Sequence, residues 1–423
     1  MTLGVDKMNE LKFNPNSSTI LHVDLNSCFA TVEQQANPHL RGKPIAVCAY
    51  TTPNGCILAP SVEAKTFGVK TGMRVKDGKN LCPDLVVLES DPWKYRNIHI
   101  SLRRLLSVYT PDITPKSIDE FVLNFAGYNL VKDKPLKTVA REIKARIKKE
   151  VGEWLTVSIG IAPNRFLAKL ASNLHKPDGL DEINGKNFFG VYSSLKLIDL
   201  PYIKIRNMIR LNSMGIYTVC DFYRVPLWKL KAAFQSINGY YWYLRLRGWE
   251  IDDFTSERKS FGNSYALPKP LITREELSPI LSKLVAKMGA RLRFAGYKTC
   301  GVRVALTYRD ETFWHKGASF EKYLFDARDI YKKAFKLMLQ SPFQNPVREV
   351  SVSCFNLIKS EALQLELFED VAKKLKLNDS IDQINMRWGN FVVVPARMLG
   401  SADYVPDRIA FGGIKELEEF ALT

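Results

Sequence analysis

The sequence lacks the marks of membrane, secreted and disulfide-bonded proteins. It has no run of about 18 apolar residues that could cross a bilayer, and residues 1–18 are polar where a signal peptide carries an apolar core. Its seven cysteines include no Cys-x-x-Cys pair, so the sequence indicates neither a zinc site nor a disulfide framework. We expect a cytoplasmic protein that meets no membrane and begins with a loose leader over residues 1–18.

Internal repeats and long low-complexity segments are also missing, which leaves ordinary globular domains. At 423 residues the chain is too long for one hydrophobic core and should fold as about three or four domains. Its content of 46% hydrophobic and 25% charged residues is that of a typical globular protein.

Acidic residues are scarce relative to basic ones. The chain has 61 Lys and Arg against 44 Asp and Glu, a formal net charge of +17. About half of this excess lies in residues 259–358, which hold 17 basic and 8 acidic residues. Such an excess favours a polyanionic partner through counterion release; a basic face kept for solubility is the alternative.

The N-terminal part predicts an α+β domain with a small inserted module. Residues 19–24 predict a buried strand, after which Asn26 and Ser27 supply the N-cap of a helix that ends near Gln35. A strand over 44–50 and a short helix over 61–67, closed by Gly68, belong to the module, which extends to about Ser90.

An acidic pair follows at a predicted bend. Residues 113–118 and 121–125 predict two short strands with Asp119 and Glu120 between them. Neighbouring residues on a straight strand point to opposite faces, so the bend is what lets both carboxylates face one point. Helices over 95–108 and 135–151, a strand over 155–162 and a helix after Asn164 predict a mixed sheet covered by two helices, with Asp24 and the pair on its open face.

The rest of the chain predicts a helical region and a second, smaller α+β unit. Residues 181–248 predict short helices broken by proline and glycine, and the polar stretch 255–260 suits a linker. Helices over 279–293 and 330–339 and strands over 299–308 and 348–355 form the second unit, and a polar tail starts near Ser360.

Asp24, Asp119 and Glu120 have the composition of a two-metal site. In phosphoryl transfer, carboxylates bridge two ions about 3.5–4 Å apart, of which one activates the attacking oxygen and the other stabilises the leaving group. Mg²⁺ prefers oxygen ligands and keeps water and substrate phosphate in its shell, so three carboxylates and one backbone carbonyl suffice. Acidic residues are common in a chain of this length, so these three alone do not establish a metal site. The surrounding sequence is what supports the hypothesis.

Three motifs supply that context. They are HVDLNSCFA over residues 22–30, KSIDE over 116–120 and TVSIGIAPN over 156–164, the last followed by AKLAS over 168–172 and HKPDG over 175–179. In order and spacing they resemble the motifs of the Y-family, lesion-bypass DNA polymerases of bacteria, and the resemblance extends from about Thr19 to Val394. It implies a right-hand fold with a ferredoxin-like palm (19–27 and 91–180), fingers (28–90), a helical thumb (181–250), a linker (251–258), an α+β little finger (259–358) and a C-terminal tail (359–423).

The resemblance also implies the roles of individual residues. Asp24, Asp119 and Glu120 would be catalytic and would hold two Mg²⁺ ions, with the carbonyl of Leu25 as a further ligand. Lys176 would meet the triphosphate of the incoming deoxynucleoside triphosphate. Phe29 matches the steric gate, a flat ring under the sugar that leaves no room for a 2′-hydroxyl; a core aromatic on the first helix is the alternative.

The fingers depart from the commonest family pattern. Where many members carry a Tyr and an Arg against the nucleotide phosphates, this sequence has Val62 and Lys65. Val62 offers no hydrogen bond, and Lys65 is a point charge without the bidentate fork of Arg; a lysine on a solvated helix face is the alternative. The segment resembles the branch that contains the catalytic subunit of polymerase V, which would imply accessory polymerase subunits.

The thumb and little finger would bind primer–template DNA. In the family a hairpin with two glycines brings backbone amides to a phosphate, but Leu200 to Lys204 lacks both, so side-chain charge would have to replace backbone approach. The candidates for DNA binding are basic residues of these two domains: Lys204, Arg206, Arg210, Arg291, Arg293, Lys298, Arg303 and Arg309.

The tail contains a short segment of another kind. Gln364, Leu365, Leu367 and Phe368 resemble the peptide that docks on the bacterial sliding clamp; a tail helix that packs these residues on the body is the alternative. The whole pattern predicts low-fidelity translesion synthesis near the nucleoid, without a second acidic set for proofreading. A non-catalytic scaffold of the same fold and a two-metal nuclease are the rival functions.

Overall fold

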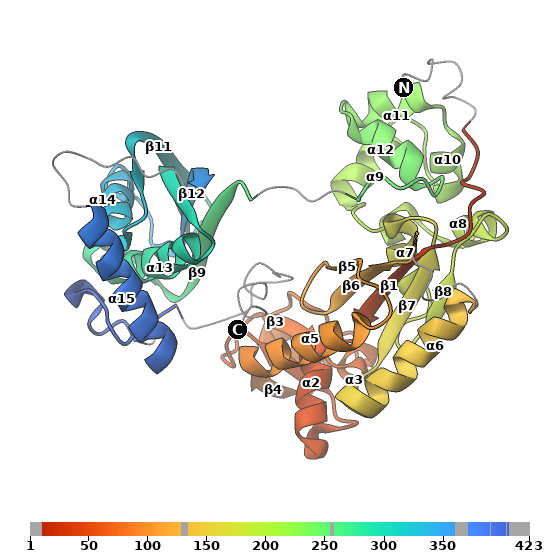
Figure 1. Cartoon of the computed structure of the whole chain (residues 1–423), viewed down its shortest axis with the longest axis horizontal. Coiled ribbons are helices and arrows are strands. Elements are labelled where there is room, and N and C mark those ends of the chain that lie inside the picture. The colour runs from red at the N-terminus through yellow and green to blue at the C-terminus, as the bar shows by residue number, and fades with distance from the viewer. Residues whose placement is uncertain are drawn as a thin grey trace. The chain divides into compact units, whose positions relative to one another are not determined.

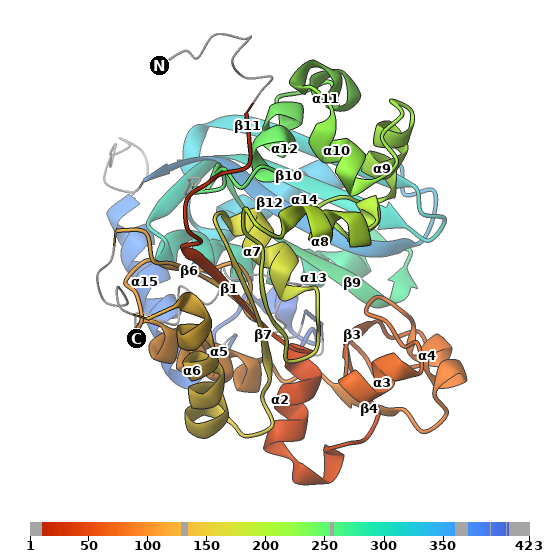
Figure 2. The same ribbon diagram turned by 90° about the vertical axis from the view of Figure 1, so that its right-hand side faces the viewer.

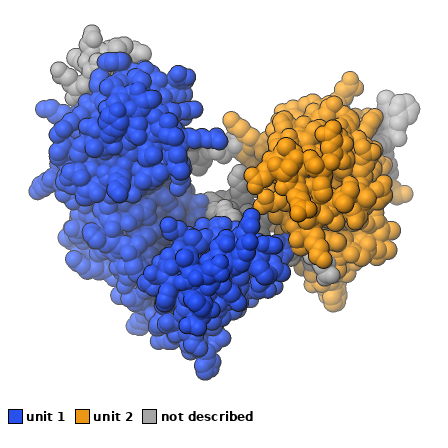
Figure 3. Space-filling view, turned by 180° about the vertical axis from the view of Figure 1, so that it is seen from behind, with its two compact units in different colours: residues 1–255, 408–423 blue, residues 256–407 orange. Residues whose placement is uncertain are grey.

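The computed structural model describes residues 11–127, 134–253, 258–359, 371–389, 391–402 and 404–405. These residues form two compact units, which come before and after residues 254–257 in the sequence and are coloured separately in Figure 3. No helix within these ranges is long and apolar enough to span a bilayer.

A five-stranded sheet organises the first unit (Figure 1). Its strand order is β5-β6-β1-β7-β8; β7 and β8 are parallel, and the other neighbours are antiparallel. The sheet is therefore mixed, as the sequence predicts. Its strands are β1 (Ile20–Leu25), β5 (Ile113–Pro115), β6 (Glu120–Asn124), β7 (Val157–Ala162) and β8 (Leu180–Glu182).

Alternation along β1 gives this sheet two different faces. Leu21, Val23 and Leu25 pack into one core together with α5 (Pro92–Leu106) and α6 (Leu136–Arg146), which continues into a π-helical turn over Ile147–Val151. These are the two covering helices that the sequence predicts. The intervening residues, His22 and Asp24 among them, point to the opposite face.

That opposite face is not fully open, which corrects the expectation from the sequence. Helix α7 (Arg165–Ser172) packs across it, and Asn164 caps the helix by accepting a hydrogen bond from the Leu167 amide at 2.8 Å. Gly160 on β7 permits this close packing, because a Cβ there would lie 2.0 Å from the Ala168 carbonyl oxygen. The carboxylates therefore share their face with a helix.

The inserted module has its own small sheet and core. Strand β2 (Ile45–Cys48) pairs with β3 (Ile57–Pro60) and, in parallel, with β4 (Val86–Glu89), and the helices are α3 (Val62–Thr66) and α4 (Val75–Leu81). Helix α2 (Cys28–Ala36) belongs to the main core instead, since Cys28, Phe29 and Val32 pack there. Ser27 precedes α2 in a left-handed conformation with φ of 49° and makes no capping hydrogen bond, unlike the predicted N-cap.

Short helices form the region after β8. They are α8 (Phe188–Ser194), α9 (Ile205–Asn212), α10 (Val219–Arg224), α11 (Leu227–Phe234) and α12 (Asn238–Arg245), with a 3₁₀ turn at Leu197–Asp199. They pack with α7 in a second core. The sequence predicts this helical character, and Figure 2 shows the group beyond the end of the main sheet.

The described part of the expected leader is not loose. Phe13 is buried and stacks on Phe188 with ring centroids 4.2 Å apart. The Asn14 side chain donates to the carbonyl of Gly248 at 3.0 Å, and the Asn14 amide donates to that of Arg247 at 2.7 Å. Residues 11–18 therefore tie the start of the chain to the helical region.

The second unit is a four-stranded antiparallel sheet covered by helices. The order is β11-β10-β12-β9, with β9 (Ser260–Leu271), β10 (Tyr297–Tyr308), β11 (Phe313–Leu324) and β12 (Val347–Lys359). Helices α13 (Arg274–Phe294) and α14 (Ala327–Met338) fill its core. The sequence misses β9 and β11, and it starts α13 at Pro279, whereas a capping box between Thr273 and Glu276 begins the helix earlier.

The expected polar tail also contains structure. Helix α15 (Val371–Trp388) is tied to the second unit by two ion pairs, Arg293 with Asp382 at 2.7 Å and Lys374 with Asp329 at 2.9 Å. A 3₁₀ turn at Ala396–Met398 follows.

Candidate active site

The register of two strands brings the first two carboxylates together. Asp24 on β1 lies directly opposite Glu120 on β6, and opposite residues of an antiparallel pair share a face. Asp119 immediately precedes β6, and its carbonyl oxygen accepts a hydrogen bond from the Leu25 amide at 2.9 Å. Sheet pairing therefore gathers Asp24, Leu25, Asp119 and Glu120 at one end of β1.

The closest group of possible metal ligands includes a histidine that the sequence reasoning missed. Within the described residues, ligand atoms of His22, Asp24 and Glu120 lie within 4.8 Å of one another. Asp119 is not in this group; its Oδ1 accepts a hydrogen bond from the Ser117 hydroxyl at 2.5 Å. His22 is two residues before Asp24 on the same strand face, and that spacing is the signal that could have found it.

Two lysines neutralise these carboxylates. Lys176 Nζ lies 2.7 Å from Asp24 Oδ2, and Lys169, on α7, forms an ion pair with Glu120 Oε2. Lys176 is a predicted site residue, and the structure places it here. Lys169 belongs to the third motif, but the sequence gives it no role, because only the packing of α7 on the sheet aims it at β6.

The electrostatics of the acidic residues differ. Burial raises the pKa of Glu120, but the contacts with His22 and Lys169 outweigh this effect and lower it to about 2. Burial and the neighbouring Asp24 and Glu120 raise the pKa of Asp119 to about 6, although the Ser117 hydrogen bond opposes the shift. Burial lowers the pKa of His22, whose Nε2 lies 3.4 Å from Glu120 without hydrogen-bond geometry. We therefore assign the countercharge of Glu120 to Lys169.

This donor set fits hard divalent cations. Two carboxylates face each other across a strand pair, and a third is next to them. The pKa of Asp119 is raised first by burial and then by the negative charge of Asp24 and Glu120. A cation with oxygen ligands would offset that charge.

Asn26 links the first motif to the segment that carries Lys176. Its Nδ2 donates to the Ser158 hydroxyl at 2.9 Å, and its Oδ1 accepts from the Asp178 amide at 2.8 Å. Asn26 is a positioning residue, whereas the sequence analysis predicts only a capping role for it.

Lys65 reaches the site from the inserted module. Its Nζ donates to the Ser27 hydroxyl at 2.8 Å. Burial lowers the pKa of Lys65, and the charge of Lys176 lowers it further while Asp24 opposes the shift. Lys65 thus lies near Lys176 and Asp24, and it is also exposed, so the predicted nucleotide contact and the alternative of a solvated helix face both agree with its position. Val62, the first residue of α3, is half-buried.

Phe29 lies under the same end of β1. Its ring stacks on Tyr95 of α5 with centroids 4.2 Å apart and planes at 12°, and 9% of the residue is exposed. The ring is thus fixed in the main core, at the first turn of the helix that follows Asp24. Both the steric-gate prediction and its core alternative agree with this position.

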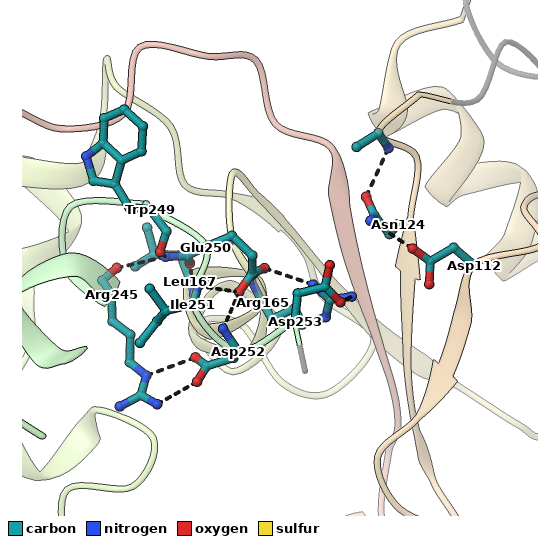
Figure 4. Close-up of polar contacts among 12 residues, drawn as sticks. Asp112, Asn124, Arg165, Leu167, Arg245, Trp249, Glu250, Ile251, Asp252 and Asp253 are labelled. Carbon is teal, nitrogen blue, oxygen red and sulfur yellow. Dashed lines mark hydrogen bonds and ion pairs between the residues drawn. The ribbon is translucent and has the colours of Figure 1, made fainter. Parts of the chain in front are cut away.

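A network of ion pairs joins the helical region to α7 (Figure 4). Arg165 contacts Glu250 at 3.2 Å and Asp253 at 2.5 Å, and its backbone amide also donates to Glu250 at 2.9 Å. Arg245 holds Asp252 through two hydrogen bonds of 2.9 and 2.5 Å. These contacts fix the segment 249–253 and the end of α12 on the sheet domain.

A pocket of about 500 Å³ lies between the sheet domain and the helical region. Its walls combine the carboxylate site with the helices: His22, Lys116, Glu120, Val122, Arg165, Phe166, Lys169, Tyr202, Asn207, Asn238, Trp242, Arg245 and Asp252. The size is that of a site for a small organic ligand.

The predicted DNA-binding residues fall into two groups. Lys204, Arg206 and Arg210 are exposed at the start and along one face of α9, and Arg303 and Arg309 are exposed on the second unit, with Arg303 pointing away from buried Val302 and Val304. The other candidates have internal partners. Arg291 donates to Asn263 at 2.6 Å, and Arg293 is bound to Asp382 and to the Phe325 carbonyl.

Two of these predictions need correction. Arg293 fastens α15 with both of its Nε and Nη2 donors, so its guanidinium is committed to a structural contact. Lys298 is 5% exposed and lies over the Phe325 ring, where it does not reach a surface ligand. The proposed clamp peptide, Gln364 to Phe368, lies outside the described residues, as do residues 254–257 of the linker.

Comparison with known proteins identifies the family of the chain. Residues 23–173 match the impB/mucB/samB family, and residues 258–367 match the C-terminal domain of the same family. "DNA polymerase IV" of Pelotomaculum thermopropionicum is 34% identical over 92% of this chain and 97% of its own length. "DNA polymerase IV 1" of Bacillus subtilis is 30% identical over 89% of this chain and 92% of its own length.

Solved structures give the same result. A Y-family DNA polymerase chimera of Dbh and Dpo4 superposes with a TM-score of 0.71 at 26% identity, covering 80% of this chain and 99% of the chimera. The insertion ternary complex of Dbh DNA polymerase gives 0.54 at 25% identity with the same coverage. These relatives do not confirm the resemblance to the polymerase V branch. The chain has the right-hand fold and belongs to the Y-family of translesion DNA polymerases, which are DNA-directed DNA polymerases.

Proposed function

We propose that the protein extends primers by two-metal nucleotidyl transfer, with Asp24, Asp119 and Glu120 as the ligands of two Mg²⁺ ions. The observation that carries the proposal is the register that sets Asp24 opposite Glu120, with Asp119 one residue before β6. The carbonyl of Leu25 supplies a further oxygen. When bound, the ions activate the primer 3′-hydroxyl and stabilise the leaving pyrophosphate.

The cationic side chains of the site bind the deoxynucleoside triphosphate. Lys176 and Lys65 converge beside Asp24, so both lie within reach of a triphosphate placed there. Phe29, fixed by Tyr95, closes the space below the sugar. Asn26 holds the segment of Lys176 in place through the Asp178 amide.

We also propose low fidelity, which rests on the family and is supported by the small inserted module. Its three-stranded sheet and two short helices have a small core of their own, and Val62 and Lys65 offer no bidentate contact to the nucleotide. A weakly held base pair tolerates damaged templates. Gap-filling on a template with a single abasic site measures this tolerance, and a stop before the lesion in every product contradicts it.

Primer extension with the wild type and with an Asp119→Ala, Glu120→Ala double variant tests the catalytic proposal. The wild type should lengthen the primer when Mg²⁺ and deoxynucleotides are present, and the double variant should not. A protein that only shortens the primer is a nuclease. A protein that binds primer–template DNA without changing the primer is a scaffold.

Exposed basic residues bind the primer–template backbone. Reversing Lys204, Arg206 and Arg210 to Glu should weaken binding and lower its salt dependence, because each lost phosphate contact reduces the slope by about one. The same reversal at Arg303 and Arg309 tests the second unit. If the salt dependence of DNA binding is unchanged, the substituted residues do not contact the DNA backbone.

Recruitment to the bacterial sliding clamp is proposed for Gln364, Leu365, Leu367 and Phe368, whose pattern of spaced apolar anchors suits a hydrophobic cleft. Deleting residues 364–368 should abolish clamp binding and leave clamp-free synthesis unchanged. Accessory polymerase subunits and a location at the nucleoid belong to the same proposal. Retained binding of the deletion variant to purified clamp would refute the assignment.

A further inference from the structure

The turn that precedes α9 contains a tyrosine where glycine is favoured. The Ile203 amide donates to the Leu200 carbonyl at 3.1 Å, which closes a four-residue turn with Pro201 in the second position and Tyr202 in the third. Tyr202 has φ of 67°. A turn with Pro second and positive φ third takes Gly or Asn there, because other side chains clash with their own backbone. The turn thus forms with a left-handed residue at its third position although the segment contains no glycine.

Core packing does not explain this tyrosine. Tyr202 is 62% exposed and is not part of the core formed by α7 and the short helices. A strained residue whose side chain does not support the core points to a functional contact. An exposed aromatic ring at a polar cleft is also a frequent ligand-binding feature.

Tyr202 faces the catalytic end of the molecule. It lines the pocket between the sheet domain and the helical region together with Glu120 and Lys169. Asn207 and Asn238 add amide groups to the same wall, and Trp242 adds an apolar surface. A ligand in this pocket thus meets both the Tyr202 side chain and one of the proposed metal ligands.

The two sides of the carboxylate site suit different substrates. Asp24 is bordered by Lys176 and Lys65, whose charges suit a triphosphate. Glu120 is bordered by Lys169 and Tyr202, a single cation and a flat ring. The second environment suits a sugar and base better than a triphosphate, and the exposed Lys204 and Arg206 beside the turn suit the following phosphates.

We propose that Tyr202 packs against the 3′-terminal nucleotide of the primer and positions it next to Glu120. This inference rests on the proposed primer-extending function. The ring contacts a nucleotide through its flat face, so the contact is independent of sequence. In this chain the Tyr202 side chain would thus contact the primer, whereas a glycine at this position could contact it only through its backbone.

Substitution of Tyr202 separates contact from folding. Tyr202→Gly removes the ring and suits the left-handed turn, so the melting temperature should stay unchanged or rise. Its KM for primer–template should rise about tenfold, the effect of losing one ring–base contact. Tyr202→Phe should retain wild-type KM. Tyr202→Asn, which also tolerates positive φ, gives a second ring-free variant if the glycine variant folds poorly.

A fluorescent primer end reports the contact directly. A primer with 2-aminopurine as its 3′-terminal base should change emission on binding wild type and Tyr202→Phe, and change less with Tyr202→Gly at saturating protein. Tyr217 is the matched control, since it is a thumb tyrosine, 66% exposed, that does not line the pocket. Tyr217→Ala should behave as wild type.

The outcomes distinguish this inference from the proposed function. If the wild type extends primers while Tyr202→Gly and Tyr202→Asn keep its KM and its 2-aminopurine signal, the inference is wrong and the function stands. If the wild type extends no primer, the proposed function fails. An equal loss in Tyr217→Ala would show a general surface effect and would also overturn the inference.

Discussion

Replacing Phe29 by alanine should widen the space below the incoming sugar and destabilise the first unit. The ring is 9% exposed and stacks on Tyr95 at 4.2 Å. Replacing a buried Phe by Ala lowers the free energy of unfolding by about 3–5 kcal/mol. Because Phe29 lies at the edge of the core, we expect the lower value, about 3 kcal/mol. For a unit of about 250 residues this lowers the melting temperature by about 6–12 °C.

The functional effect follows from the same geometry. Forcing a hydroxyl against a fixed ring costs about 1–3 kcal/mol, which corresponds to about 5- to 150-fold in kcat/KM. Phe29→Ala should therefore raise kcat/KM for a ribonucleotide, relative to the matching deoxynucleotide, by this factor. Single-nucleotide insertion on one primer–template, with both nucleotides at several concentrations, measures the ratio.

Tyr95→Phe provides the control. The Tyr95 hydroxyl donates to Glu33 at 2.9 Å and accepts from the Asp91 amide at 3.1 Å. The substitution removes these bonds and keeps the ring stack, so it should lower stability while sugar discrimination stays as in the wild type. An unchanged discrimination ratio in Phe29→Ala, or an equal change in Tyr95→Phe, refutes the steric-gate assignment and leaves Phe29 as a core residue.

Three further changes test charge and stability. Lys65→Arg should lower KM for deoxynucleotides about three- to tenfold in steady-state insertion, because Arg adds a bidentate phosphate contact. Burial and neighbouring carboxylates raise the pKa of Asp119 to about 6. The charged carboxylate therefore destabilises the metal-free fold above about pH 6, whereas below about pH 4 it is protonated and has no such effect. In urea titrations, Asp119→Asn should raise the free energy of unfolding by about 1–3 kcal/mol above about pH 6 and leave it unchanged below about pH 4. Burial raises the pKa of Asp326, but hydrogen bonds from Arg328 outweigh burial and lower the pKa below its usual value. Asp326→Ala should therefore lower the free energy of unfolding by about 1–2 kcal/mol at neutral pH. The difference from the wild type should shrink below about pH 4, because the wild-type carboxylate is then protonated and no longer stabilises the fold.

The edge strands show where prediction from sequence stops. Strands β10 and β12 are central and alternate apolar and polar residues, and both are predicted. Strands β9 and β11 lie at the two edges of the same sheet and are missed. β9 contains Pro268 and Pro270, which an edge strand tolerates because one side of it needs no partner. Such strands form because a neighbour pairs with them, and their own sequence carries little periodic signal.

The sequence alone determined the family and pointed to the three candidate carboxylates. The strand of Asp24, the bend at Asp119 and Glu120 and the third motif are local patterns, each encoded within a few neighbouring residues. Their mutual register follows from β pairing, which those patterns strongly constrain.

Only the tertiary structure decided which charges meet. Lys169 forms its ion pair with Glu120 from another element, and Arg293 pairs with Asp382. Phe13 packs on Phe188 of α8, which lies far along the chain. The left-handed backbone of Tyr202 is likewise visible only in the structure, because its segment contains no glycine that would indicate positive φ. These partnerships join residues distant in sequence, so their energies depend on packing that no local pattern records.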